Sequence, residues 1–173
     1  MSVTRRKLLK TTALGAAALA APHVWIPGAR EAWGATLVEG EPIKVGLLFS
    51  LTGGLAVPEE DSTLVMQYAI DEINAAGGVA GMPIEPVIVD AKSDFKVYSE
   101  KTRELILRDK VISIFGCYTS ASRKAILPIV MQQDNLLFYP TCYEGAECTQ
   151  NTICTGPLAN QHSFDLIPYM VEQ

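Results

Sequence analysis

The chain has 173 residues and a formal net charge of −5, and 49% of its residues are hydrophobic. A length of this order suits one domain core of the usual ~100–200 residues. Because an acidic chain binds polyanions poorly, we expect neither a nucleic acid nor an anionic lipid surface as its partner.

The first 34 residues are predicted to be an export signal and not part of the fold. A basic segment, TRRKLLK (residues 4–10), precedes an alanine-rich apolar run over residues 11–21. That run is too short to span a bilayer, and small residues that suit a signal peptidase follow it. The basic segment closely resembles the twin-arginine (Tat) motif, which implies export by the Tat translocase into the periplasm. The alternative interpretation is a basic amphipathic anchor that is retained.

Loss of this signal makes the remainder of the chain more acidic. Residues 1–34 contain five basic residues and one acidic residue, so the net charge of residues 35–173 is −9. Residues 35–173 are predicted to form a single domain, and its charge further disfavours binding to DNA or RNA.

From residue 42 onward, strand-like apolar runs alternate with helical patterns. Strands are predicted over residues 43–50, 84–90, 111–115, 136–139 and 151–156. Helices are predicted to begin near Asp61 or Ser62, after a cap at Asp94, near Ser120 and after a cap at Asn160. The first of them has an apolar stripe of Val65, Met66, Ala69, Ile70 and Ile73 and stops at Gly77. This alternation predicts an α/β fold with a doubly wound parallel sheet.

Polar loops follow the third and fourth predicted strands. Ligands of open α/β sheets lie just beyond the carboxyl ends of the strands, so the two loops together predict one wall of a small-molecule site. Hydroxyl residues in the first loop are also suited to cap the next helix, whose free N–H groups would then face the ligand. The candidate residues are Tyr118, Thr119 and Ser120 in the first loop, and Tyr139, Pro140, Thr141, Tyr143 and Glu144 at the end of the fourth strand and in the loop after it.

Catalytic chemistry finds little support in the sequence. Neither GxxxxGK[ST] nor GxSxG occurs, and the glycine-rich residues 77–81 follow a helix instead of opening one. With His23 inside the signal, His162 is the one histidine of residues 35–173, and nothing in the sequence pairs it with a nucleophile. We therefore expect a binding protein, not an enzyme, without a cofactor.

The four cysteines, Cys117, Cys142, Cys148 and Cys154, do not form a CxxC pair or a cluster with histidine. A zinc site is therefore not expected. In an exported protein they could form disulfides in three possible pairings, or they could pack as free thiols. Both interpretations remain open.

Four segments resemble the type I periplasmic substrate-binding proteins, the superfamily that contains the branched-chain amino acid receptors. They are KVGLLFSLTGG (44–54), DEINAAGGVAGMPIEPVIVDAKSD (71–94), FGCYTSASRKAILPIV (115–130) and LLFYPTCYEGAEC (136–148). The resemblance extends over residues 42–173, and the combination of GCYTSASRK with FYPxxYEG is most similar to the branch that binds urea and short-chain amides.

The resemblance implies the extracytoplasmic receptor of an ABC importer, which delivers its ligand to a membrane permease. It also implies two lobes that close on the ligand, so this chain would be the N-terminal lobe without the second. A single lobe is expected to bind weakly, because binding pockets usually cover 70–90% of a ligand.

The eight candidate residues of the two loops match the first-lobe ligand contacts that the resemblance implies. Hydroxyl and N–H groups would donate to the carbonyl of a neutral amide, Glu144 would accept from its nitrogen, and tyrosine rings would shield it. Four other interpretations stay open: a structural role for Tyr139, Pro140 or Glu144, or for Ser120 and Ser122 as helix caps; a leucine-type amino acid as ligand; an amide-sensing regulator; and an exported amide-processing enzyme.

Overall fold

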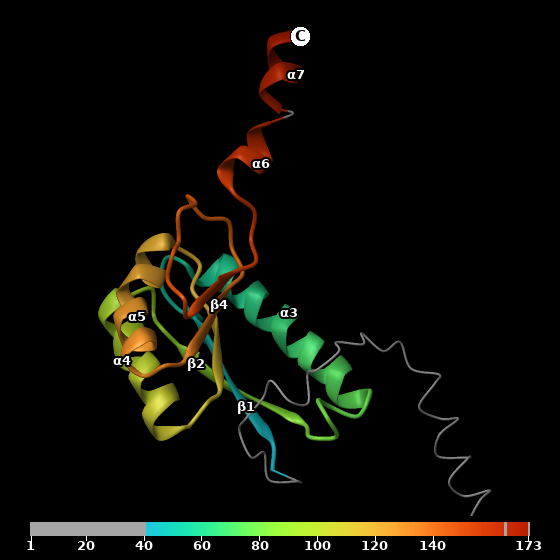
Figure 1. Cartoon of the computed structure of the whole chain (residues 1–173), viewed down its shortest axis with the longest axis vertical. Coiled ribbons are helices and arrows are strands. Elements are labelled where there is room, and N and C mark those ends of the chain that lie inside the picture. Colours follow the sequence, from blue (N-terminus) through green and yellow to red (C-terminus); the bar gives the residue numbers. More distant parts are fainter. Residues whose placement is uncertain (1–40, 165, 173) are drawn as a thin grey trace, which may run out of the picture. The chain divides into compact units, whose positions relative to one another are not determined.

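The computed structural model describes residues 41–164 and 166–172 (Figure 1). The predicted export signal lies outside the described residues, so it remains a prediction. In the described part, five strands form one sheet in the order β2-β1-β3-β4-β5, and all neighbouring strands are parallel. The strands are β1 (Ile43–Phe49), β2 (Ile84–Asp90), β3 (Ser113–Gly116), β4 (Leu136–Tyr139) and β5 (Thr152–Cys154).

Helices connect these strands and cover the two faces of the sheet, which confirms the predicted doubly wound α/β fold. The helices are α3 (Ala56–Ala75), α4 (Phe95–Arg103), which continues into the π-helical turn η1 (Glu104–Arg108), α5 (Ser120–Gln132), α6 (Ala159–Ser163) and α7 (Leu166–Glu172). Figure 1 shows α4 and α5 side by side on one side of the sheet and α3 on the other.

The central strands β1 and β3 are largely buried, because their side chains alternate between two apolar clusters on the two faces of the sheet. Toward α4 and α5, Leu48, Ile114 and Leu137 pack in one cluster with apolar residues of those helices. Toward α3, Leu47 and Phe49 pack with Ile70. The carboxyl ends of the strands therefore emerge at one edge from a well-packed core.

Helix α3 differs from its prediction in both its start and its buried face. It begins at Ala56, with Pro58 in its first turn, where proline is tolerated, and not near Asp61. Val65 is 66% exposed and Ile73 is 40% exposed, so the predicted apolar stripe is wrong at these positions. The buried residues are Glu59, Thr63 and Ile70. The apolar pattern does not reveal the buried face of α3, because the inward positions 59 and 63 carry the polar side chains of Glu59 and Thr63.

The remaining boundaries are close to their predictions, with two corrections. Asp94 caps α4 as predicted, accepting from the N–H groups of Lys96 and Val97. Strand β3 begins at Ser113, two residues later than predicted, and ends at Gly116, one residue later. The final helix is not a single helix capped by Asn160, because it consists of two short helices, and the N-cap of the first is Leu158, two residues earlier.

A fully buried carboxylate joins the start of α3 to the end of β1. Oε2 of Glu59 accepts hydrogen bonds from the backbone N–H of Ser50 and from the Tyr98 hydroxyl, each at 2.5 Å. Its Oε1 atom is buried without a hydrogen-bond partner. Burial raises the pKa of Glu59 above its ordinary value, and the bonds from Tyr98 and Ser50 oppose that shift.

Because the folded protein holds the Glu59 proton more tightly than the unfolded chain, its stability should fall as pH rises above the ordinary glutamate pKa of 4.5. Glu59→Gln removes this titration. We expect the Tm of Glu59→Gln, relative to that of the unchanged protein, to rise between pH 4.5 and pH 8 in thermal unfolding followed by circular dichroism. The same substitution at the exposed neighbour Glu60 is the control and should show a flat difference. A flat difference for Glu59→Gln would contradict the assignment.

Candidate functional site

Two glycines allow the loops beyond the sheet to pack closely. A Cβ atom at Gly116 would overlap the carbonyl oxygen of Leu48, so only glycine lets β3 end against β1 at this point. A Cβ atom at Gly156 would overlap the carbonyl oxygen of Thr141 in the same way. The loop after β4 and the segment after β5 are therefore in direct backbone contact at the predicted site.

Helix α5 starts at the site with a reciprocal cap. The Thr119 hydroxyl accepts from the N–H of Ser122 at 3.1 Å, and the Ser122 hydroxyl oxygen accepts from the N–H of Thr119 at 3.2 Å. The helix thus begins at Ser120, within the hydroxyl-rich loop where its start was expected. The N–H groups of Ser120 and Ala121, its first two residues, have no acceptor within a helix and are left for other partners.

Hydroxyl groups of the second loop hold the first loop in place. The hydroxyls of Tyr139 and Thr141 both donate to the carbonyl oxygen of Tyr118, each at 2.8 Å. Tyr139 is completely buried, whereas Tyr118 is 38% exposed. The Tyr139 side chain therefore joins β4 to the loop after β3.

The guanidinium of Arg123 lies between the two loops and is 1% exposed. It donates to Glu144 at 3.1 Å and to Glu147 at 3.3 Å, and it stacks 4.6 Å from the centre of the Tyr139 ring. Tyr143 lies on it as well, at 5.8 Å. Sequence reasoning missed this residue. An arginine in the first turn of a helix, where the helix dipole disfavours a cation, was the available signal.

Glu144 collects hydrogen bonds from three side chains of α5. Its Oε1 accepts from Lys124 at 2.7 Å and from Arg123, and its Oε2 accepts from the Ser120 hydroxyl at 2.5 Å. Lys124 and Ser120 are the main causes that hold the pKa of Glu144 well below its ordinary value. The carboxylate therefore stays ionised throughout the physiological pH range, and its side chain is 45% exposed.

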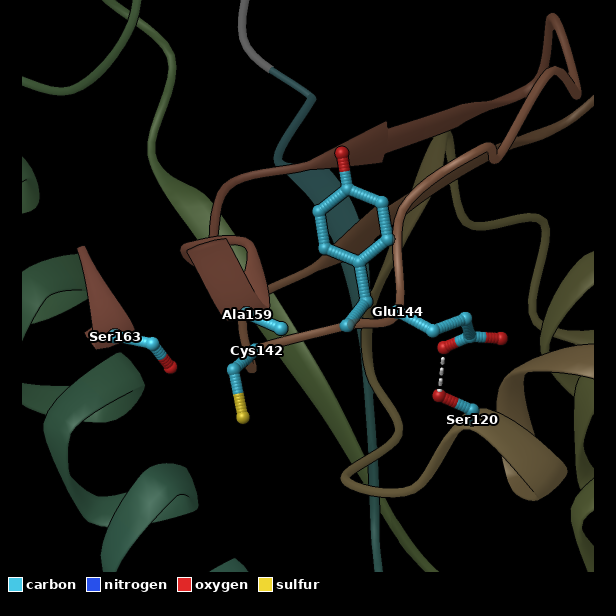
Figure 2. Close-up of a pocket in the computed structure, with 6 residues that line it drawn as sticks. Ser120, Cys142, Glu144, Ala159 and Ser163 are labelled. Carbon is cyan, nitrogen blue, oxygen red and sulfur yellow. Dashed lines mark hydrogen bonds between the residues drawn. The ribbon is translucent and has the colours of Figure 1, made fainter. Parts of the chain in front are cut away.

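An open pocket of about 470 Å³ lies beside the Ser120–Glu144 hydrogen bond. Figure 2 shows these two side chains pointing toward each other, with Cys142 and Ser163 lying apart from them on the left of the view. The pocket is lined by Ser120, Cys142, Tyr143, Glu144, Ala159 and Ser163.

The structure brings three of the eight predicted site residues into this pocket: Ser120, Tyr143 and Glu144. Pro140 and Thr141 instead line a separate pocket of about 290 Å³ against α3. Ala159 and Ser163 of α6 also line the first pocket, and neither was predicted. No local motif marks them, because α6 reaches the pocket only through the close packing of Gly156 against the backbone of Thr141.

The four cysteines are free thiols in the structure. Cys117 is buried, which raises the pKa of its thiol, and Cys142 and Cys148 are exposed. Among residues 41–164 and 166–172, no group of three or more His, Cys, Asp or Glu side chains is arranged to bind a metal. No helix in the same part of the chain is long and apolar enough to cross a bilayer.

The sequence of residues 43–173 matches the family model of the periplasmic binding protein domain. The chain belongs to the periplasmic binding protein family. Leu/Ile/Val-binding protein homolog 7 of Brucella abortus is 38% identical over 133 residues, which is 75% of this chain and 32% of that protein. This periplasmic binding protein domain thus spans about a third of the length of that curated relative.

Solved structures agree with this assignment. The branched-chain amino acid transporter substrate-binding protein LivJ from Streptococcus pneumoniae, in complex with isoleucine, is 29% identical, with a TM-score of 0.64 over 66% of this chain and 33% of that chain. A fatty acid ABC transporter substrate-binding protein from Thermomonospora curvata shares the fold at 21% identity, with a TM-score of 0.64 over 76% of this chain and 33% of that chain. Homologues of this periplasmic binding protein thus include substrate-binding proteins of transporters, among them an ABC transporter substrate-binding protein from Sphaerobacter thermophilus that is 31% identical, with a TM-score of 0.53 over 57% of this chain and 26% of that chain.

Arg123→Met should destabilise the protein because it leaves Glu147, whose side chain is only 11% exposed, without its cation. We expect a loss of about 3 kcal/mol in the free energy of unfolding, measured with guanidinium chloride at pH 7. Arg123→Lys should not restore it, because an ammonium group cannot replace the planar fork between two carboxylates. Lys124→Met is the control, since Lys124 is 62% exposed and its ion pair should contribute about 0.5 kcal/mol. Equal losses at the two positions would contradict the role given to Arg123.

Proposed function

We propose that this protein is the extracytoplasmic solute-binding component of an ABC importer for urea or a short-chain amide. The observation that carries the proposal is that hydrogen-bond donors and acceptors meet at one pocket. The free N–H groups at the start of α5 lie in the same turn as Ser120, whose side chain lines the pocket with the carboxylate of Glu144. A ligand that combines a carbonyl with N–H groups complements this arrangement.

Each part of an amide has a partner of suitable chemistry. The carbonyl oxygen accepts from the N–H groups of Ser120 and Ala121, where the helix dipole also favours negative charge. An amide nitrogen donates to Glu144, which remains ionised and is 45% exposed. Tyr143 supplies an aromatic surface against a planar molecule. Tyr118, Thr119, Tyr139 and Thr141 support this wall through the hydrogen bonds that join and cap the two loops.

A branched-chain amino acid is the second candidate ligand, and the similarity to LivJ, whose structure contains isoleucine, favours it. Its carboxylate would occupy the N–H groups of α5 and its ammonium group would lie at Glu144. An amide is neutral at its carbonyl group, whereas an amino acid carries a negative carboxylate there. Binding experiments with both kinds of ligand can therefore distinguish the two candidates.

The proposed partners follow from this role. A membrane permease of the importer would receive the ligand from the binding protein, and the Tat translocase would export the protein to the periplasm before that. A cleaved leader and recovery of the protein in a periplasmic extract would support this route. Retention in the cytoplasm would favour the amide-sensing regulator instead, and turnover of acetamide would favour an enzyme.

Isothermal titration of the purified protein with urea, acetamide, formamide and leucine tests the ligand class. We expect saturable binding of at least one of the three neutral ligands and no heat from leucine at the same concentrations. Binding of leucine alone would replace the amide proposal with the amino acid receptor. Absence of heat from all four would contradict binding by this chain.

A further inference from the structure

We propose that Arg123 and Glu144 together lock the Ser120 hydroxyl into the role of a hydrogen-bond acceptor, so that the pocket selects a ligand N–H group and rejects a carboxylate oxygen at this position. The inference deepens the proposed function, on which its ligand-binding arm rests. It makes Glu144 a specificity-determining residue and Arg123 a positioning residue.

The orientation of the hydroxyl follows from what its two neighbours can do. Arg123 lies with Nη1 3.4 Å from Ser120 Oγ, and a guanidinium can only donate. Glu144 lies with Oε2 2.5 Å from the same oxygen, and an ionised carboxylate can only accept. The hydroxyl hydrogen must therefore point to Glu144. The lone pair that remains on Ser120 can only accept a hydrogen from a ligand.

Because Glu144 stays ionised, the orientation of the Ser120 hydroxyl does not change with pH over the physiological range. Four titratable or charged groups surround Glu144: Arg123 and Lys124 from α5, Glu147 from its own loop, and Cys154 of β5, which lies near Arg123. The two cations lie within hydrogen-bond distance of Glu144, whereas Glu147 binds Arg123 and the Thr149 hydroxyl. Protonation of Glu144, which would release Ser120, is therefore opposed.

Acetamide and acetate form a matched pair of probes, because they differ only in an NH₂ group in place of a charged oxygen. With the lock in place, acetate would present an oxygen to Ser120 and to the exposed carboxylate of Glu144, where both contacts are repulsive. Acetamide would present N–H donors to the same two groups. A preference of at least tenfold for acetamide is expected in the unchanged protein.

The first arm of the test needs no ligand. A neutron crystal structure of the deuterated protein should show the deuterium of the Ser120 hydroxyl directed at Glu144. A deuterium directed into the pocket would overturn the proposal, whatever the protein binds. This arm remains decisive if the proposed function fails and neither probe binds.

The second arm compares Glu144→Ala with Glu147→Ala by titration with acetamide and acetate. Each variant removes one carboxylate bound to Arg123, but only the first releases the Ser120 hydroxyl. We expect the preference for acetamide to fall at least tenfold in Glu144→Ala and to keep its direction and size in Glu147→Ala, even where overall affinity is lower. An equal change in both variants would show that general charge, and not the orientation of Ser120, sets the preference, and would overturn the proposal.

A third variant separates positioning from stability. Ser120→Ala removes the acceptor while the contacts of Glu144 with Arg123 and Lys124 can persist. It should lower affinity for acetamide while leaving that for acetate unchanged or increased, with folding checked by circular dichroism. A parallel loss for both probes would indicate a structural role only and contradict the assignment.

Discussion

The buried guanidinium of Arg123 is the constraint on which the edge that carries the candidate site depends. A cation that is 1% exposed must be compensated, and here two carboxylates and the faces of two tyrosines provide that compensation. Those four partners all come from β4 and the loop after it. The charge thus ties a loop without regular structure to the first turn of α5, and the pocket lies where the two meet.

Glu59 is a second buried ionisable residue at the same edge of the sheet. Glu59 joins α3, the end of β1 and α4 through Ser50 and Tyr98, and it resembles Arg123 in using one side chain to satisfy groups on different elements. Both lie beyond the carboxyl ends of the strands, while the sheet itself is packed with apolar residues. The apolar core thus supports a polar edge whose side chains are already held in fixed directions by hydrogen bonds. Such preorganisation favours specific binding of a small polar molecule.

Much of the fold was predictable because strand-like runs and turn residues act locally. Residues 84–90 and 136–139 are strands with the predicted bounds, and Asp94 caps its helix as predicted. The face of α3 was predicted poorly, because a buried carboxylate at Glu59 reads as a solvent-exposed residue until its partners Ser50 and Tyr98 are known. Of the predicted site, Ser120, Tyr143 and Glu144 meet at the pocket, whereas the hydroxyls of Tyr139 and Thr141 are directed to the Tyr118 carbonyl.

The sequence by itself determined the alternation of strands and helices, the polar loops at one edge of the sheet and the family, because each depends on residues close together in the chain. Only the tertiary structure decided what the polar residues do there. Glu144 and Ser120 are 24 positions apart, and their hydrogen bond exists because β3 and β4 are neighbours in the sheet. Arg123 is an ordinary helical cation in the sequence, and it becomes the centre of the candidate site because folding buries it between two loops.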